Sequence, residues 1–177
     1  GSADQKRGVA SPSFLQVLMK SPDSESHWRW QPPTGAPYSG RRRSLALWMT
    51  DSHDGAGHLL ARVIVNRLWQ HHFGQGLVAT PNDFGVQGGK PSHPELLDWL
   101  ANDLIQSGWK LKALHKRLMT TAAYTQSSRF EPANAKLDPE NRFLWRHTPR
   151  RLEAEIVRDN ALAISGLLVP DVGGPGV

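Results

Sequence analysis

The sequence contains no cysteine among its 177 residues. A disulfide, a thiolate zinc site and a covalently attached c-type haem all require cysteine, so none of them can belong to this chain. Apolar runs that approach the roughly 18 residues of a membrane-spanning helix are missing too, as are recognised motifs such as HExxH, GxSxG and the Walker loop. We therefore predict no membrane span, no metal site and no cofactor in this chain.

Positively charged residues outnumber negatively charged ones only modestly. Lys and Arg number 21 against 16 Asp and Glu, a formal net charge of +5. Basic residues are concentrated only at 41–43 and 110–117, whereas a nucleic-acid-binding domain usually gathers them on one face. Anionic partners are therefore favoured slightly, and nucleic-acid binding is the least favoured function.

What the sequence does contain is helical periodicity interrupted by 13 prolines and 16 glycines, with no convincing series of strands. This pattern predicts a mainly α fold of about five helices around one central helix, with long irregular loops. Residues 1–40 are predicted to be an extended lead-in, in which Gly1-Ser2 has the pattern of a cloning scar. Residues 41–177 are predicted to form a single helical domain that is truncated at its C-terminal end.

The helices are expected at particular ranges. They are 43–49, 58–73, 94–107, 110–124 and 151–167, with single turns at 14–19 and 139–145. Apolar residues surround 58–73 on nearly every side, which indicates the central helix. Ser92 and Glu95 have the spacing of a capping box at the start of 94–107.

Side-chain burial follows from the same periodicity. We expect Leu45, Trp48 and Met49 to point inward from 43–49, and Trp28 and Trp30 to pin the lead-in onto the main body. The last helix is expected to bury four apolar residues, which are Leu152, Ile156, Ala163 and Leu167.

The central helix carries a polar stripe in an apolar setting. Arg62, Asn66 and Gln70 are four apart and share one face, with Trp69 beside them. Buried polar groups need specific partners. One interpretation is that Arg62 ties down the following loop or the last helix. The other is ligand binding, because an arginine fork can clamp a carboxylate or phosphate.

The last helix carries a row of charges. Arg151, Glu155, Arg158 and Asp159 share one face at spacings that suit ion pairs. A solvated or inter-helix salt network is one interpretation. The alternative places Glu155 or Asp159 opposite Arg62 across a cleft, as a carboxyl group with acid–base use.

The loop at 74–93 is long for a compact domain, and such loops are often functional. Asp83 and His93 are its candidate catalytic residues, although Asp83 also suits an Asx turn.

Several segments resemble one known family. They are RVIVNRLWQHHFGQGLV (62–78), TPNDFGVQGGKPSHPELLDWLA (80–101), GWKLKALHKRLMTTAAYTQSS (108–128), DPENRFLW (138–145) and RRLEAEIVRDNALAISGLL (150–168). Together they are similar to the planctomycete-specific C-terminal domain of unknown function (domain of unknown function 1553), over roughly residues 41 to 177. That family occurs in large proteins with cytochrome c-like domains. The resemblance implies export to a periplasmic or extracytoplasmic setting, and it supplies no catalytic residue.

Two main functional hypotheses follow. The first is a non-catalytic accessory or interaction module that binds other domains of its parent protein or an anionic polysaccharide, motivated by exposed Lys112, Lys116 and Arg117. The second is a hydrolase acting on polysaccharide through the Arg/Asp/Glu/His cluster. The candidate catalytic residues are Asp83, His93, Glu155 and Asp159, and the candidate binding residues are Arg62, Asn66, Trp69, Gln70, Arg151 and Arg158.

Overall fold

A computed structural model of the chain describes residues 11–170 and residue 173. It falls into two units, Gly1–Gln126 and Ser127–Val177, each of which is described by itself. Helices and irregular loops account for the described residues, and no β-strand occurs among them. The predicted mainly α class is confirmed. The Gly1-Ser2 pair and most of the tail after Pro170 lie outside the described residues.

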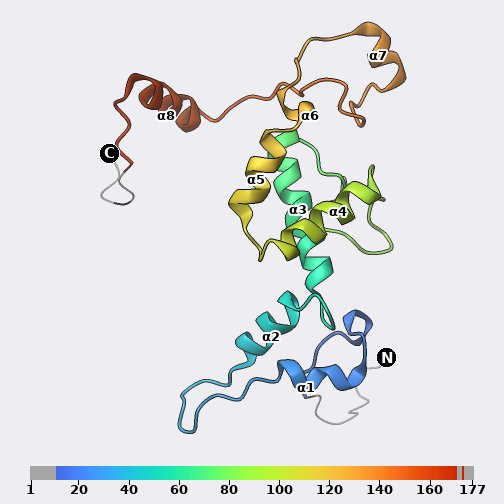
Figure 1. Cartoon of the computed structure of the whole chain (residues 1–177), viewed down its shortest axis with the longest axis vertical. Helices are drawn as coiled ribbons and strands as arrows, with labels where there is room; N and C mark the ends of the chain where they lie inside the picture. The colour runs from blue at the N-terminus through green and yellow to red at the C-terminus, as the bar shows by residue number, and fades with distance from the viewer. Residues whose placement is uncertain (1–10, 171–172, 174–177) are drawn as a thin grey trace, which may run out of the picture. The chain divides into compact units, whose positions relative to one another are not determined.

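The first unit contains most of the helices (Figure 1). They are η1 (Gln16–Leu18), η2 (Pro22–Ser24), α1 (Glu25–Trp28), α2 (Arg41–Thr50), α3 (Gly57–Phe73), α4 (Pro94–Gln106), α5 (Leu111–Met119) and α6 (Ala122–Thr125). The predicted helices at 43–49, 58–73 and 94–107 therefore correspond to α2, α3 and α4. Helices η2 and α1 fall within the lead-in, which was expected to be extended.

Helix α3 packs against α2, α4 and α5 (Figure 1). The contacts between α3 and α4 are the most extensive, and both helices contribute fully buried residues. The buried apolar residues of α3, α4, α5 and the α3–α4 loop are Ala61, Val65, Trp69, Phe73, Leu77, Val78, Leu97, Leu100, Ala101, Leu104, Leu114 and Leu118. A place for α3 at the centre of the chain as a whole stays a prediction.

Two local predictions were wrong for reasons of hydrogen bonding. The helix expected at 110–124 is broken, because Thr121 adopts an extended conformation and its hydroxyl accepts a hydrogen bond from Tyr124 N–H at 3.3 Å, starting α6. The capping box is absent: His93 is the N-cap of α4, and the Ser92 hydroxyl donates to the Leu77 carbonyl at 3.3 Å.

A separate small core joins the lead-in to α2. Its buried residues are Trp28, Trp48 and Ala56, and Phe14 packs at its edge with its ring centroid 5.5 Å from that of Trp28. Trp28 therefore holds the lead-in in place, as expected. Leu45 was expected to point inward and is 46% exposed, whereas Trp48 is buried in this core and Met49 packs against it.

Asp51 is the polar centre of this junction. Its Oδ2 accepts a hydrogen bond from Trp28 Nε1 at 2.8 Å, and its Oδ1 accepts from the backbone N–H groups of His53 at 2.8 Å and Asp54 at 3.1 Å. Burial raises the pKa of Asp51, but the hydrogen bonds from His53, Trp28 and Asp54 outweigh it, and the pKa lies below its ordinary value. One carboxylate thus links the lead-in to the turn between α2 and α3.

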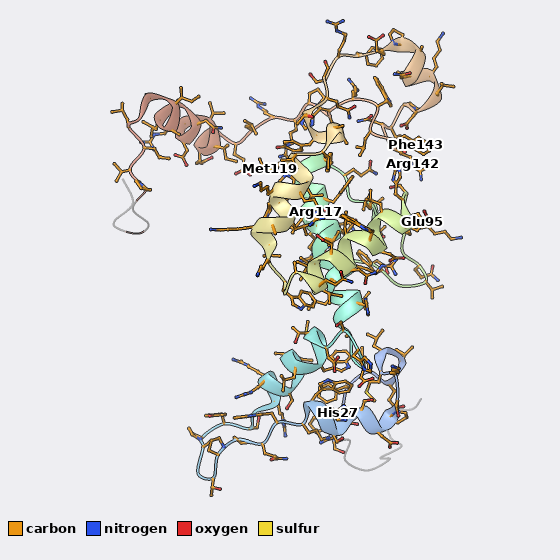
Figure 2. The ribbon with its side chains drawn as sticks, in the orientation of Figure 1. His27, Glu95, Arg117, Met119, Arg142 and Phe143 are labelled. Carbon is orange, nitrogen blue, oxygen red and sulfur yellow. The ribbon has the colours of Figure 1, made fainter. Side chains whose placement is uncertain are left out.

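The second unit contains α7 (Pro132–Leu137) and α8 (Ala154–Ser165). Buried Asp138 follows α7 and accepts hydrogen bonds from the N–H groups of Arg142 at 2.9 Å and Phe143 at 2.8 Å. Arg142 and Phe143, labelled in Figure 2, are exposed at this turn. Turns therefore occur within 139–145, where a single turn was predicted, and Asp138 directly precedes them, whereas the helix of this region, α7, ends at Leu137.

Helix α8 buries none of its residues. Leu152, Ile156 and Leu167 are 46%, 44% and 69% exposed, so the prediction that they and Ala163 are buried was wrong for the structure described. Periodicity shows only that a helix has an apolar side, and α7 does not pack closely against this one. Across the described residues, no helix has both the length and the apolar character needed to cross a membrane.

Replacing Asp51 by Asn is expected to lower the free energy of unfolding at pH 7 by about 1 kcal/mol, because the Trp28 indole loses its carboxylate acceptor. Since the folded pKa is lowered, the contribution of this carboxylate is complete above the unfolded value of about 3.9 and is lost as pH falls through the folded value. The difference between wild type and Asp51→Asn should therefore shrink in acid. Urea unfolding followed by tryptophan fluorescence at several pH values measures it.

Asp23→Asn is the control for this change, because Asp23 is an exposed carboxylate of the same lead-in. It should alter stability little at any pH. A difference for Asp51→Asn that grows as pH falls would contradict this account of the junction.

Candidate functional site

Asn66, the middle residue of the predicted polar stripe, is fully buried. Its Nδ2 donates to the carbonyl of Val78 at 3.0 Å, and its Oδ1 accepts from the N–H of the same residue at 2.8 Å. Both polar ends of the amide are thereby satisfied by one loop residue. The side chain holds the 74–93 loop on α3, which is a structural role.

The loop approaches α3 closely at Gly76. A Cβ atom at this position would lie 2.6 Å from the Val78 carbonyl oxygen and 2.8 Å from Asn66 Nδ2. No side chain fits there without a shift of the backbone or of Asn66. Gly76 and Asn66 together therefore determine how the loop leaves α3.

Arg62 has a different partner from either that the sequence suggested. Its Nε lies 3.3 Å from Asp98 Oδ1 of α4, as an ion pair without the geometry of a hydrogen bond. The two side chains are 37% and 56% exposed, so the pair contributes at most about 1 kcal/mol. Trp69 is buried and stacks on Phe73 with ring centroids 4.1 Å apart, while Gln70 is half-buried.

The loop residues Asp83 and His93 are held locally. Asp83 Oδ1 accepts from Gly85 N–H at 2.8 Å, which confirms the predicted Asx turn. His93 Nδ1 lies 3.0 Å from the Ser92 hydroxyl. These contacts give each residue a structural role, and their predicted catalytic role stays a prediction.

The charges predicted on the last helix, Arg151, Glu155, Arg158 and Asp159, are all exposed. In the part of the chain that the structure describes, no ion pair joins any two of them. Correct spacing was not sufficient, because holding long exposed side chains together costs entropy that a solvated pair barely offsets. They belong to the second unit, so a meeting of Glu155 or Asp159 with Arg62 stays a prediction.

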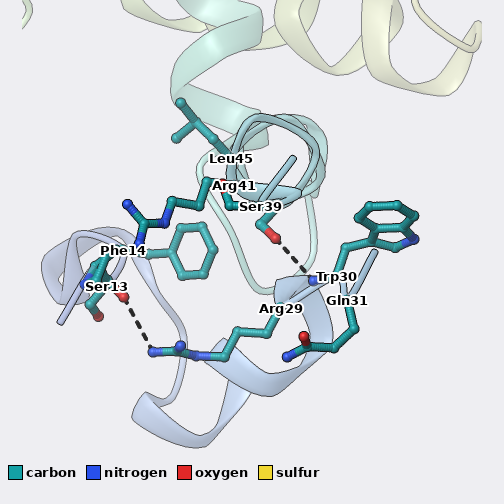
Figure 3. Close-up of a pocket in the computed structure, with 10 residues that line it drawn as sticks. Ser13, Phe14, Arg29, Trp30, Gln31, Ser39, Arg41 and Leu45 are labelled. Carbon is teal, nitrogen blue, oxygen red and sulfur yellow. Dashed lines mark hydrogen bonds between the residues drawn. The ribbon is translucent and has the colours of Figure 1, made fainter. Parts of the chain in front are cut away.

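Sequence reasoning missed a pocket of about 360 Å³ between the lead-in and α2 (Figure 3). We call it the α2 pocket. Its lining residues are Pro12, Ser13, Phe14, Arg29, Trp30, Gln31, Ser39, Arg41, Ser44 and Leu45. Two arginines, hydroxyl and amide groups and an apolar wall thus meet in one place. No Asp, Glu or His is among these lining residues, so the pocket presents positive charge without a carboxylate or imidazole.

Backbone contacts fix the walls of the α2 pocket. Trp30 N–H donates to the Ser44 hydroxyl at 2.9 Å, and Arg29 Nη2 donates to the Pro12 carbonyl at 3.3 Å (Figure 3). Arg29 also pairs with Glu25. Gly40 joins the walls with φ +71°, and a Cβ there would lie 2.6 Å from the Trp30 ring. Only glycine allows this approach without strain.

The start of α2 is unusually positive. Arg41, Arg42 and Arg43 occupy its first turn, which contains no acidic residue and no side-chain cap. The helix dipole already places partial positive charge there, so these arginines favour an anion at this end. Arg43 lies 4.4 Å from the centroid of the Trp30 ring, which in turn stacks on Tyr38.

One signal in the sequence could have located this site. The Arg41 to Arg43 run directly follows a glycine and comes shortly after Trp30 and Tyr38. Its weakness is that the pocket also needs Ser13 and Phe14, which only the folded lead-in brings near. Within residues 11–170 and 173, no three His, Asp or Glu side chains are placed to hold a metal ion.

Replacing Asn66 by Leu is expected to lower the free energy of unfolding by about 2–4 kcal/mol, since the buried N–H and carbonyl of Val78 lose their partners. Chemical denaturation measures this loss. Gln70→Ala, one turn further along α3, is the control and should cost less than about 1 kcal/mol. If Asn66→Leu left stability unchanged, Asn66 would be free for a ligand and its structural role refuted.

Comparison with known proteins adds one result. The model of the family described as "Protein of unknown function (DUF1553)", PSD1, matches residues 41–177. No curated protein and no solved structure matches the chain. This chain therefore belongs to that family of proteins of unknown function.

Proposed function

We propose that the chain is a non-catalytic interaction module that binds an anionic polymer, an acidic or sulfated polysaccharide, through the start of α2. The observation that carries this proposal is the exposure of Arg41, Arg42 and Arg43 in one helical turn without an acidic neighbour in that turn. A polyanion would supply the negative charge that this turn lacks.

A binding role fits the α2 pocket better than a hydrolytic one. Polysaccharide hydrolysis needs a general acid and a second carboxylate or activated water. The described lining of the pocket offers arginine, serine and glutamine, and none of these serves as the acid–base pair. The hydrolase alternative therefore gains no support from this pocket.

The basic residues of α5 are a weaker place for the same function. Arg117, labelled in Figure 2, pairs with Asp103 at 3.0 Å and lies 5.2 Å from the Trp99 ring centroid. Its charge is therefore balanced by α4. Lys112 and Lys116 remain exposed, but without a pocket beside them among those described.

The setting belongs to the same proposal. An exported, periplasmic or extracytoplasmic, multidomain protein of the planctomycete type would meet acidic polysaccharides outside the cytoplasm. Other domains of that protein would be further partners of this module. The resemblance of this chain to the family supports this setting.

Affinity for heparin at several NaCl concentrations tests the proposal. Wild type should bind, and its log K should fall linearly with log [NaCl]. The triple variant Arg41→Ser, Arg42→Ser, Arg43→Ser should bind more weakly, with a salt slope smaller by roughly 3, one for each cation removed.

Lys110→Ser, Lys112→Ser, Lys116→Ser is the matched control, because it removes the same charge from exposed positions on α5 and at its N-cap. It should retain most of the wild-type affinity. Equal losses in the two triple variants would place the binding elsewhere than at α2, and salt-independent retention would refute the polyanion proposal.

A further inference from the structure

The α2 pocket has the size of a site for a small unit rather than for a long chain. Its volume of about 360 Å³ lies near the lower end of ligand pockets, which span roughly 300–1,000 Å³. The exposed arginines at the start of α2 could attract any polyanion. The pocket beside them can in addition select which unit of the polymer enters.

The two arginines of the pocket differ in the charge they offer. Arg29 is already paired with Glu25 and held by the Pro12 carbonyl. Arg41 is exposed, and no ion pair of Arg41 occurs among the described residues. The pocket therefore presents about one uncompensated positive charge, which suits a unit that carries a single anionic group.

The remaining polar lining suits hydroxyl groups. Ser13, Ser39 and Gln31 are neutral groups that both donate and accept hydrogen bonds. A ligand with several hydroxyls can bond to such groups without bringing further charge. An inorganic anion would use Arg41 and leave these groups unused.

The apolar wall suits an aliphatic ring face better than a nucleic-acid base. Phe14 packs edge-on against Trp28, and Trp30 stacks on Tyr38 beneath the Arg43 guanidinium. Bases bind single-strand sites by stacking on available aromatic faces, and these two rings are already engaged. Leu45, which is 46% exposed, adds an aliphatic surface.

We propose that the α2 pocket is a subsite for one anionic sugar residue, whose carboxylate or sulfate pairs with Arg41, whose hydroxyls bond to Ser13, Gln31 and Ser39, and whose ring packs on Leu45. This inference rests on the proposed function and names the unit that the pocket takes from the polymer.

Isothermal titration calorimetry on the intact chain tests it with defined probes. Short oligogalacturonides carry the carboxylate, heparin-derived oligosaccharides of the same length carry sulfate, and a neutral malto-oligosaccharide carries neither. Binding by at least one acidic oligosaccharide, and none by the neutral one, is the expected result. The two acidic probes decide which anion the pocket prefers.

Three variants distinguish binding in the pocket from attraction by the general positive charge of the α2 start. Arg41→Met should weaken binding of the acidic oligosaccharide by at least about tenfold. Arg42→Met removes the same charge from the next residue, which does not line the pocket, and should weaken it by less than about twofold. Leu45→Ser leaves the charge unchanged and should weaken it by about threefold to tenfold. Circular dichroism of each variant verifies that it is folded.

Four results would overturn the subsite. Sodium sulfate that binds as tightly as the acidic sugars would make the pocket a bare anion site, and an oligo(dT) that binds more tightly would make it a nucleic-acid site. Retention on heparin without any binding of short acidic sugars would refute the subsite and leave the proposed polyanion binding intact. If the chain is neither retained on heparin nor binds a short acidic sugar, the polyanion proposal and the subsite proposal are both refuted.

Discussion

The hydrogen bonds between Asn66 and Val78 are the constraint on which the helical core depends. A fully buried amide and a buried peptide unit satisfy each other where water cannot reach them. Because Val78 is fixed on α3, the neighbouring Leu77 carbonyl is placed to accept from Ser92 N–H at 2.8 Å, at the far end of the same loop. That second bond lies directly before α4. These bonds hold both ends of the loop, beside an α3–α4 interface that is mostly apolar and also contains the Arg62–Asp98 ion pair.

A second polar contact builds the candidate site. Asp51 joins Trp28 to the α2–α3 turn, and the lead-in then lies along α2. The family model matches residues 41–177, whereas residues 12–39 provide most of the lining of the α2 pocket. Helix α2 of the family domain therefore contributes the exposed charge, and the preceding segment contributes the enclosure. A segment of this kind can change which ligand is selected while the core of the domain stays the same.

The separation of structural from functional polar groups follows from burial. Asn66 is held on both sides by backbone groups, and Arg62 forms an ion pair with Asp98. A ligand-binding role for either residue stays a prediction. Arg41 lies in the opposite situation, exposed at a helix start that lacks acidic neighbours. A polar residue in an apolar stretch of sequence is more readily explained by a backbone partner. The cluster Arg41 to Arg43 forms no ion pair among the described residues, although Arg43 lies over the Trp30 ring.

Local patterns in the sequence determined the mainly α class, the positions of α2, α3 and α4, and the Asx turn at Asp83, because each depends on residues within a few positions of one another. They also located Asn66 as a polar residue that needs a partner, without identifying Val78. Tertiary structure alone decided the exposure of Leu45, the pairing of Arg62 with Asp98 and the assembly of the α2 pocket. Each of these joins residues far apart in the sequence, or depends on which helix fills a given space. Helical periodicity gives the direction of a side chain, and only packing decides what it meets.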